Sequence, residues 1–251
     1  RVYRACNCWV RGPQKTKRGR VLFANDTHIG YSQPSIWYEA HLEAPGLQLY
    51  GNFLAGFPFP LIGHTERHSW GLTMYLNDDL DLYREKVQGD SVLHASGWRP
   101  VREEKQLIPV QDRAADTLRV RHSAHGPILN QVLDKLPEKA PSIAASWTYL
   151  DFPVKAVEAA YRMSFAPNME AFYAGAHLLP APGLNVMYGD RAGNYAWWAV
   201  ARLRLYDEQV NTHRILEGST GKDDLRGYAP VEASPHAINP AGGYVYSANN
   251  P

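Results

Sequence analysis

The sequence predicts an α+β fold that combines many antiparallel strands with one helical layer. Short segments that alternate between apolar and polar residues, separated by Gly and Pro turns, dominate residues 20–84. Helical periodicity is concentrated in residues 154–178, and further strand-like segments follow it. Runs of strands with the helices grouped in one place are typical of α+β domains.

The first half of the chain contains most of the expected strands. We expect extended structure in residues 21–28, 37–42, 47–54 and 69–75. Residues 85–125 are more polar and contain a hairpin-like pair at 108–110 and 118–120. The charged, Pro-bounded stretch 134–141 is expected to be an exposed loop.

Two helices are predicted next. In residues 154–165, one helical face would carry Val157, Ala160, Tyr161 and Phe165. The second helix covers 169–178, with Asn168 as its N-cap after a proline. Two strands, 184–188 and 195–201, follow and are joined by the turn 189–194. No internal repeat or low-complexity segment is present.

The composition excludes some classes of partner. The chain has 251 residues, 45% of them hydrophobic, which is enough for a sizeable core. Lys and Arg number 26 against 25 Asp and Glu, so charge offers no reason to expect a nucleic acid or an acidic membrane as partner. No apolar run is long enough to span a membrane, and no signal peptide is seen. Aromatic residues make up 12% and line either a core or an apolar pocket.

The only two cysteines, Cys6 and Cys8, are one residue apart. This spacing would strain a disulfide, and two thiols are too few for a zinc site. A cysteine that becomes the first residue of its chain can attack with its sulfur while its own α-amine takes the proton. Five residues precede Cys6, so its nitrogen is still part of a peptide bond. Ordinary buried thiols, or a redox pair that departs from the C-x-x-C spacing, are the alternatives.

Several motifs together resemble one family. The chain is similar to the penicillin acylase family of N-terminal-nucleophile hydrolases, which includes acyl-homoserine-lactone and cephalosporin acylases. The motifs occur in the family's order over nearly the whole chain. They are Cys6-Asn7-Cys8-Trp9, Ala24-Asn25-Asp26-Thr27-His28, Pro34-Ser35-Ile36-Trp37-Tyr38-Glu39, Gly63-His64, Trp70-Gly71-Leu72-Thr73, Asn77-Asp78-Asp79-Leu80-Asp81, His125-Gly126-Pro127, Gly189-Asp190-Arg191-Ala192-Gly193-Asn194, Asn239-Pro240 and Ala248-Asn249-Asn250.

The resemblance implies a partial αββα sandwich of antiparallel sheets. Residues 1–5 would be a linker remnant, and residues 6–251 would be one incomplete domain, the first half of a β-chain. The family's α-chain and the rest of the β-chain would be its missing partners, and the parent protein would be periplasmic or secreted. The implied activity is removal of an acyl group from an N-acyl substrate such as a β-lactam or an acyl-homoserine lactone, without an organic cofactor. Self-cleavage of the Ala5–Cys6 bond would free the nucleophile.

The resemblance also assigns catalytic roles. Cys6 aligns with the nucleophile, and His28 with a residue that orients the nucleophile and its amine. The side-chain amide of Asn249 and the backbone N–H of Met74 would stabilise the oxyanion. Without the other motifs, Asn249 would be taken for a turn residue and His28 for an ordinary surface or core histidine. Cys8 is expected to be structural.

By resemblance, an apolar pocket holds the acyl group. The residues near the family's pocket positions, which could equally belong to a plain core, are Ile29, Tyr31, Trp37, Leu54, Phe57, Leu72 and Met74.

Asn77-Asp78-Asp79-Leu80-Asp81 packs three carboxylates into four residues, which favours a hard cation. The family often carries calcium here, and the matching ligands would be Asp78, Asp81 and the carbonyls of Leu80 and Arg204. A further ligand would come from the α-chain, and Arg204 replaces a usual proline. The alternative is a solvated acidic turn.

The sequence raises two further hypotheses, a zinc site and a non-catalytic fragment. His64 and His68 have the H-x3-H spacing of some zinc sites, but their strand and turn context and the lack of a further ligand argue against a metal, so His64 is taken as structural. The main rival to an acylase is a non-catalytic or unprocessed fragment that keeps the fold.

Overall fold

The computed structural model describes residues 6–133, 137 and 140–249, and these fall into two compact units. The expected linker remnant, residues 1–5, lies outside the described residues. Unit 1 comprises Arg1–Asn77, Phe152–Leu203 and Ala229–Pro251, and unit 2 comprises Asp78–Asp151 and Arg204–Tyr228.

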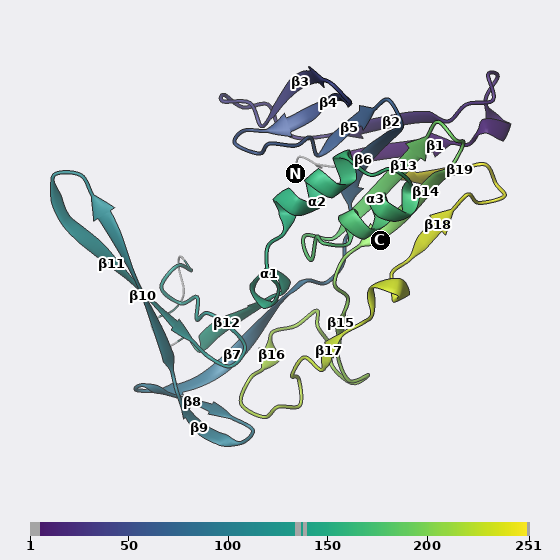
Figure 1. Ribbon diagram of the computed structural model, residues 1–251. Helices are drawn as coiled ribbons and strands as arrows, with labels where there is room; N and C mark the ends of the chain where they lie inside the picture. Colours follow the sequence, from purple (N-terminus) through teal and green to yellow (C-terminus); the bar gives the residue numbers. More distant parts are fainter. Residues whose placement is uncertain (1–5, 134–136, 138–139, 250–251) are drawn as a thin grey trace. The chain divides into compact units, whose positions relative to one another are not determined.

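The larger sheet of unit 1 is antiparallel and has seven strands in the order β18-β14-β13-β6-β5-β4-β3 (Figure 1). Four of its strands, β3 to β6, follow one another along the chain, and the connection between β4 and β5 is longer than the two turns beside it. The strands are β3 (Trp37–Ala44), β4 (Leu47–Leu54), β5 (Ile62–Thr65), β6 (His68–Met74), β13 (Leu184–Asp190), β14 (Tyr195–Val200) and β18 (His236–Ile238).

A second sheet of unit 1 has the order β19-β1-β2, formed by β19 (Tyr244–Ser247), β1 (Cys6–Arg11) and β2 (Leu22–Thr27). Its inner face packs on the larger sheet through a cluster of buried residues. Cys8, at 1% exposure, belongs to this cluster together with Val10, Met187, Tyr195 and Val245. The second sheet therefore places β1 directly against the central strands of unit 1.

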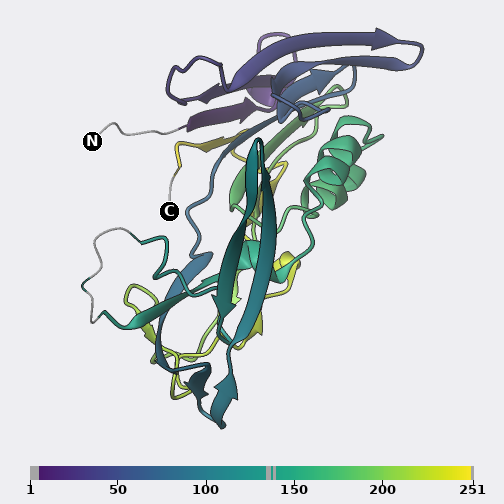
Figure 2. The ribbon, with the colours of Figure 1, turned by 90° about the vertical axis from the view of Figure 1, so that its left-hand side faces the viewer.

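Helices α2 (Ala156–Ser164) and α3 (Met169–Ala176) cover the other face of the seven-stranded sheet (Figures 1 and 2). Phe172 of α3 is fully buried and its ring contacts those of Trp70, Tyr188 and Trp198 on β6, β13 and β14. Unit 1 thus has three described layers, helices on a sheet on a second sheet, with a core at each of the two interfaces.

Unit 2 is also mainly antiparallel, and its core is small. Tyr83, Ala144 and Leu216 are its buried hydrophobic cluster. The main sheet has the order β12-β7-β8-β9, and β16 pairs with β7 in parallel. The elements are β7 (Leu80–Gln88), β8 (Ser91–His94), β9 (Gly97–Pro100), the hairpin β10 (Arg102–Val110) and β11 (Arg113–His122), β12 (Ser142–Trp147), α1 (Thr148–Asp151), β15 (Arg204–Leu205), β16 (Leu216–Glu217) and β17 (Gly227–Tyr228).

The α+β prediction is confirmed, and the six strands expected at 21–28, 37–42, 47–54, 69–75, 184–188 and 195–201 begin and end within two residues of those bounds. The hairpin expected at 108–110 and 118–120 is longer, because β10 and β11 pair from Arg102 to Val110. Asn168 is the expected N-cap, since its side chain accepts a hydrogen bond of 2.8 Å from the Ala171 N–H. Most of the expected loop 134–141 lies outside the described residues.

The four residues expected on one face of the first helix differ in burial, because only Ala160 among them is buried. Val157, Tyr161 and Phe165 are 49%, 51% and 43% exposed, whereas Ala159, Ala160 and Met163 are buried. The helix α3 approaches α2 closely at Gly175, where a Cβ atom would lie 2.8 Å from the Arg162 Cβ. Close approach of two helices favours small residues at the contact, so the alanines face inward instead of the aromatic rings.

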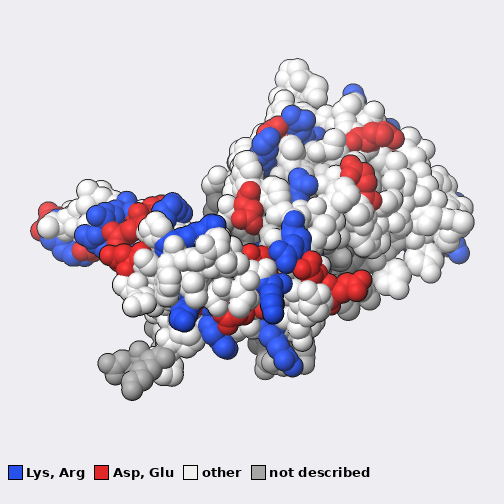
Figure 3. Space-filling model, turned by 90° about the horizontal axis from the view of Figure 1, so that it is seen from below, with Lys and Arg blue, Asp and Glu red and all other residues white. Residues whose placement is uncertain are grey.

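The surface is mixed in charge. On the face in Figure 3, Lys and Arg side chains are interspersed with Asp and Glu, as the near-zero net charge of +1 suggests. In the part of the chain that the structure describes, no helix has the length and apolar character needed to cross a membrane.

Candidate active site

The topology of the small sheet brings Cys6 close to Asn249, which is far from it in the sequence. Cys6 is the first residue of β1, and β1 lies between β2 and β19. The strand β19 ends at Ser247, two residues before Asn249. As a result, the backbone nitrogen of Cys6 donates a hydrogen bond of 2.5 Å to Oδ1 of Asn249. Two residues assigned to catalysis from opposite ends of the sequence are therefore in direct contact.

The side-chain amide of Asn249 is held at both ends. Its Nδ2 donates to the Met74 carbonyl at 2.8 Å, while its Oδ1 faces Cys6. Its backbone has φ +59°, a left-handed conformation that asparagine tolerates better than most residues. Its own N–H lies 3.2 Å from the Ser247 hydroxyl oxygen. A turn residue is therefore used here to aim an amide at the first residue of β1.

The backbone N–H of Met74 points away from the neighbouring strand β13. Tyr75 donates its N–H to the Gly183 carbonyl at 3.0 Å, and Met74 is opposite Leu184. In an antiparallel pair, hydrogen-bonded positions alternate, so the N–H groups of Leu72 and Met74 face the other edge of β6. There the Leu72 N–H donates to Oδ1 of Asn25 at 3.1 Å. The Met74 N–H is the next donor along that edge.

Asn25 connects β1 to this edge of β6. Besides accepting from Leu72, its Nδ2 donates to the carbonyls of Asn7 at 2.9 Å and of Leu72 at 3.2 Å. Gly71 provides the space, because a Cβ atom there would lie 2.7 Å from Oδ1 of Asn25. Asn25 therefore fixes the distance between the strand that begins with Cys6 and the strand that ends with Met74.

The buried amide of Asn185 was missed by sequence reasoning. It is 2% exposed, and its Nδ2 lies 2.9 Å from the Met74 carbonyl, 3.1 Å from the Thr73 hydroxyl and 3.2 Å from the Ser247 hydroxyl. Its Oδ1 accepts from the Trp197 indole N–H at 2.8 Å. The Thr73 and Ser247 hydroxyls are themselves 2.7 Å apart. Asn185 sits in an apolar strand pattern, and nothing local in the sequence distinguishes it from a strand asparagine at a sheet surface.

The strand register brings His28 close to Cys6, but the His28 side chain is hydrogen-bonded to Asp26. Thr27 is the partner of Cys6 in the β1–β2 pair, and His28 follows it. The His28 Nε2 lies 2.9 Å from a carboxylate oxygen of Asp26, and both side chains are well exposed. Among the described residues, no hydrogen bond joins His28 to Cys6.

Apart from Met74, described above, the residues expected at the acyl pocket divide into three groups. Trp37, Leu54 and Phe57 lie together at one end of the β3–β4 hairpin, because Trp37 is opposite Leu54 and the Phe57 N–H donates to the Leu54 carbonyl at 3.0 Å. Leu72, at 8% exposure, is part of the core under the helices. Ile29 is half-buried and Tyr31 fully exposed, both in the segment between β2 and β3.

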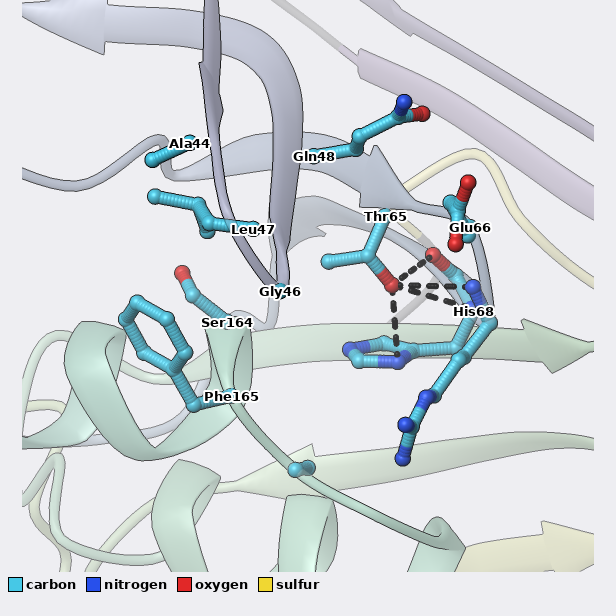
Figure 4. Close-up of a pocket in the computed structure, with 11 residues that line it drawn as sticks. Ala44, Gly46, Leu47, Gln48, Thr65, Glu66, His68, Ser164 and Phe165 are labelled. Carbon is cyan, nitrogen blue, oxygen red and sulfur yellow. Dashed lines mark hydrogen bonds between the residues drawn. The ribbon is translucent and has the colours of Figure 1, made fainter.

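A hollow of about 380 Å³ opens between the β3–β4 turn and the end of α2, lined by residues that include Leu47, Thr65, His68 and Phe165 (Figure 4). None of the residues expected at the active site or acyl pocket lines it. His68 lies at its wall, where Nε2 is 2.9 Å from the Met163 carbonyl and Nδ1 is 3.3 Å from the Thr65 hydroxyl. Burial lowers the pKa of His68, so this ring is a neutral structural group.

The expected calcium site is tested by the surroundings of Asp81. Its carboxylate is 1% exposed, and one oxygen, Oδ2, lies 3.1 Å from Nη1 of Arg204 and accepts from the Tyr206 hydroxyl at 2.5 Å. Arg204 also donates to the Ser146 carbonyl at 2.8 Å, and its side chain is 2% exposed. Among the described residues, the other carboxylate oxygen of Asp81, Oδ1, has no hydrogen-bond partner, and neither do the side-chain amide atoms of Asn77.

A calcium ion is typically bound by about six to eight oxygen ligands at distances of roughly 2.3–2.6 Å. Here a guanidinium already neutralises the central carboxylate, and Asp78 is exposed. The Arg204 side chain places its positive charge beside Asp81, and this charge would repel a metal ion bound at the same carboxylate. The residues present therefore do not fit a calcium ion at this turn.

The two cysteines differ strongly in environment. Cys8 is buried at 1% exposure, and burial raises the pKa of its thiol, so it is held as a neutral thiol. Cys6 is only partly buried, and both residues are free thiols. A buried neutral thiol is a poor redox partner, which argues against the two-cysteine redox hypothesis.

Comparison with known proteins relates this geometry to a family. The family described as Penicillin amidase matches residues 3–251. Acyl-homoserine lactone acylase QuiP of Pseudomonas aeruginosa is 29% identical over 98% of this chain, and penicillin G acylase of Escherichia coli is 27% identical over 97%. This chain spans only 30% and 28% of those two proteins.

The fold comparison agrees. The thermostable penicillin G acylase from Alcaligenes faecalis superimposes with a TM-score of 0.84 at 23% identity, over 98% of this chain and 44% of that one. This chain therefore has the same fold of stacked antiparallel sheets and helices as that penicillin G acylase. Because the family model matches almost all of its residues, the chain belongs to the penicillin amidase family.

Proposed function

We propose that the protein containing this chain is an acylase with Cys6 as its nucleophile. It would hydrolyse the amide bond of an N-acyl substrate such as a β-lactam or an acyl-homoserine lactone. The observation that carries the proposal is the contact of Cys6 with Asn249, whose amide in turn reaches Met74. The relatives named as acylases support the same reaction class.

Activation requires cleavage of the Ala5–Cys6 bond. The Cys6 thiol would attack the Ala5 carbonyl carbon, and the C–N bond would break as the Cys6 nitrogen takes a proton. Water would then hydrolyse the thioester, leaving a carboxyl group on Ala5 and a free α-amine on Cys6. Asn249 Oδ1 already accepts a hydrogen bond from this nitrogen and would orient the amine after cleavage.

In the catalytic cycle, the α-amine would take the thiol proton as the sulfur attacks the substrate carbonyl carbon. Negative charge then develops on the carbonyl oxygen. The Met74 N–H and Asn249 Nδ2 would donate to it, with Asn249 exchanging its bond to the Met74 carbonyl. Collapse breaks the C–N bond, the leaving nitrogen takes the proton from the ammonium, and water hydrolyses the thioester by the reverse sequence.

The acyl group would bind near the segment that follows β2. Ile29 is two residues beyond Thr27, the partner of Cys6. We assign the acyl pocket to Ile29, Tyr31 and the group Trp37, Leu54 and Phe57, and leave out Leu72 because it is in the core. Each methylene of the acyl chain would change binding by about 1–3 kcal/mol. His28 is kept as a positioning residue, and an exported, periplasmic location follows only from the family resemblance.

The test uses the full-length protein. Intact mass and N-terminal sequencing should find a chain that begins at residue 6 in the wild type and in Cys6→Ser, but an uncut chain in Cys6→Ala. Release of the free acid from penicillin G and from acyl-homoserine lactones should be lost in Cys6→Ala. Cys8→Ala is the matched control and should keep both cleavage and hydrolysis, because Cys8 only packs in the core.

Two results would reject the proposal. Hydrolysis by Cys6→Ala at the wild-type rate would remove Cys6 as the nucleophile. A wild-type chain that stays uncut before Cys6 and hydrolyses neither substrate class would instead favour the hypothesis of a non-catalytic or unprocessed fragment.

A further inference from the structure

Unit 2 contains a cluster of metal-binding side chains that the proposed function does not use. His94 ends β8, His125 lies in the turn after β11, and Asp224 is in the loop after β16. One ligand atom from each of the three lies within 4.8 Å of the others. The three residues come from segments far apart in the sequence.

The geometry suits one ion. His94 Nε2 lies 3.2 Å from one carboxylate oxygen of Asp224, and His125 Nε2 lies 3.1 Å from the other. A tetrahedral zinc with bonds of about 2.0–2.1 Å keeps neighbouring ligand atoms about 3.3 Å apart. Each observed separation is close to that value, but the two involve different oxygens of Asp224, so the carboxylate would turn to place one oxygen beside both nitrogens around a metal ion.

A buried carboxylate orients His125. Oε1 of Glu85 lies 2.8 Å from His125 Nδ1, and the Glu85 side chain is 1% exposed. Metal-binding histidines usually donate their second ring N–H to such a carboxylate. With the Nδ1 proton directed to Glu85, the Nε2 lone pair faces an oxygen of Asp224. Two lone pairs 3.1 Å apart need a cation between them, which is either a second proton on the ring or a metal ion.

Packing holds the ligands in place. The Tyr83 ring stacks on His125 at 3.9 Å between centroids and an angle of 8°. The Tyr83 hydroxyl donates to the Asp223 carbonyl at 2.9 Å, which fixes the loop that carries Asp224. Asp223 also accepts from the Glu217 N–H at 2.9 Å. A preformed ligand set of this kind avoids the ordering cost of metal binding.

The charge balance also favours a divalent ion. Glu85 and Asp224 are two carboxylates in contact with the same imidazole, and the nearby Arg226 guanidinium is bonded to Asp207 and to the Gly221 carbonyl. With neutral histidines, the cluster would carry two negative charges. One divalent ion neutralises both.

We propose that His94, His125 and Asp224 bind a divalent transition-metal ion, with Zn²⁺ preferred and water at a fourth position. A ligand set of two imidazoles and one carboxylate binds such ions in preference to calcium or magnesium, which prefer oxygen ligands. The metal would join β8, the turn after β11 and the loop after β16 of unit 2. This site is independent of the acylase proposed for Cys6.

The test is metal binding by the chelator-treated, full-length protein. Co²⁺ alone, followed by its visible absorption, should bind at one ion per chain with a tetrahedral-type spectrum, and Zn²⁺ should displace it. Glu85→Gln should weaken binding roughly 10–100-fold. His94→Ala and Asp224→Asn should weaken it more. His213→Ala is the matched control in the same unit and should bind as the wild type does, because His213 is exposed and outside the cluster.

Thermal unfolding of each variant shows that it is folded, and Asp224→Asn keeps the shape of the side chain if His94→Ala does not fold. Absence of stoichiometric Co²⁺ and Zn²⁺ binding by the wild type would overturn the proposal and leave His125 as an imidazolium between two carboxylates. Equal binding by the wild type, His94→Ala and Asp224→Asn would overturn it as well.

Discussion

The two units bury their polar groups in different ways. In the described part of unit 1, the buried polar side chains are hydroxyls, an amide and an imidazole: Thr73, Ser164, Asn185, Ser234, Ser247 and His68. Among the described residues, the buried carboxylates are Asp81 and Glu85, and both are in unit 2, where the hydrophobic cluster is small. Unit 1 has two larger apolar clusters.

The difference shows how each unit obtains a unique structure. A large apolar core needs only a few neutral hydrogen bonds to set strand positions, and in unit 1 these bonds also orient Asn249 and Met74 around Cys6. Unit 2 has a smaller apolar cluster, and its buried carboxylates Asp81 and Glu85 are paired with the side chains of Arg204 and His125. Paired buried charges specify geometry, but removal of one partner leaves the other charge buried without compensation, which lowers the free energy of unfolding.

The largest effect is expected where a buried charge loses its partner. Arg204→Met leaves the carboxylate of Asp81 buried without its cation and should cost about 3–5 kcal/mol of unfolding free energy. Denaturant unfolding measures the loss, and hydrogen exchange should place it in unit 2. Adding Asp81→Leu to Arg204→Met should recover most of the stability.

Arg226→Met is the matched control for this substitution. Its ion pair with Asp207 is also in unit 2, but both side chains are more than 40% exposed, so the expected cost is about 0–1 kcal/mol. Equal losses for Arg204→Met and Arg226→Met would show that unit 2 does not depend on buried charge.

A smaller effect is expected from the neutral network of unit 1. Asn185→Leu removes the partner of the Trp197 indole and of the Met74 carbonyl and should cost about 1–3 kcal/mol. Cleavage before Cys6 and amide hydrolysis should fall as well, because the position of Met74 is loosened. Thr16→Val, which removes a partly exposed turn hydroxyl, is the comparison. Full activity in a destabilised Asn185→Leu would limit this network to a structural role.

Acid should weaken unit 1 through His68. Its folded pKa is lowered by burial, so it binds fewer protons folded than unfolded. The stability that it supports is present above the unfolded pKa of about 6.5 and is lost as pH falls below that value. Hydrogen exchange of β6 and α3 at pH 7.5 and 5.5 measures this, and His68→Gln should reduce the pH difference. An unchanged difference in His68→Gln would assign the acid effect to other groups.

The smallest expected effect is that of calcium. Because Arg204 neutralises Asp81, addition of millimolar CaCl2 or of a calcium chelator should leave the melting temperature of the wild type unchanged. In Arg204→Ala the guanidinium is removed, and calcium should then stabilise the variant. A calcium-dependent melting temperature in the wild type would contradict the role assigned to Arg204.

Much of the fold could be predicted from local sequence, and the family motifs proposed the catalytic residues. Alternating patterns located the central strands, a proline followed by Asn168 located a helix start, and ordered motifs singled out Cys6 and Asn249. These signals are local because strand alternation, capping and turn conformation depend on a few neighbouring residues.

The tertiary structure decided what depends on distant contacts. The inward face of α2 is set by its approach to Gly175, the amide of Asn185 acquires its role only beside Ser247, and the side chain of Arg204 replaces an expected cation at Asp81. His94, His125 and Asp224 are likewise brought together only by the fold of unit 2. Pairing between residues a hundred positions apart leaves no periodic trace in the chain, because the partner of each side chain is chosen by strand order and packing rather than by its neighbours in sequence.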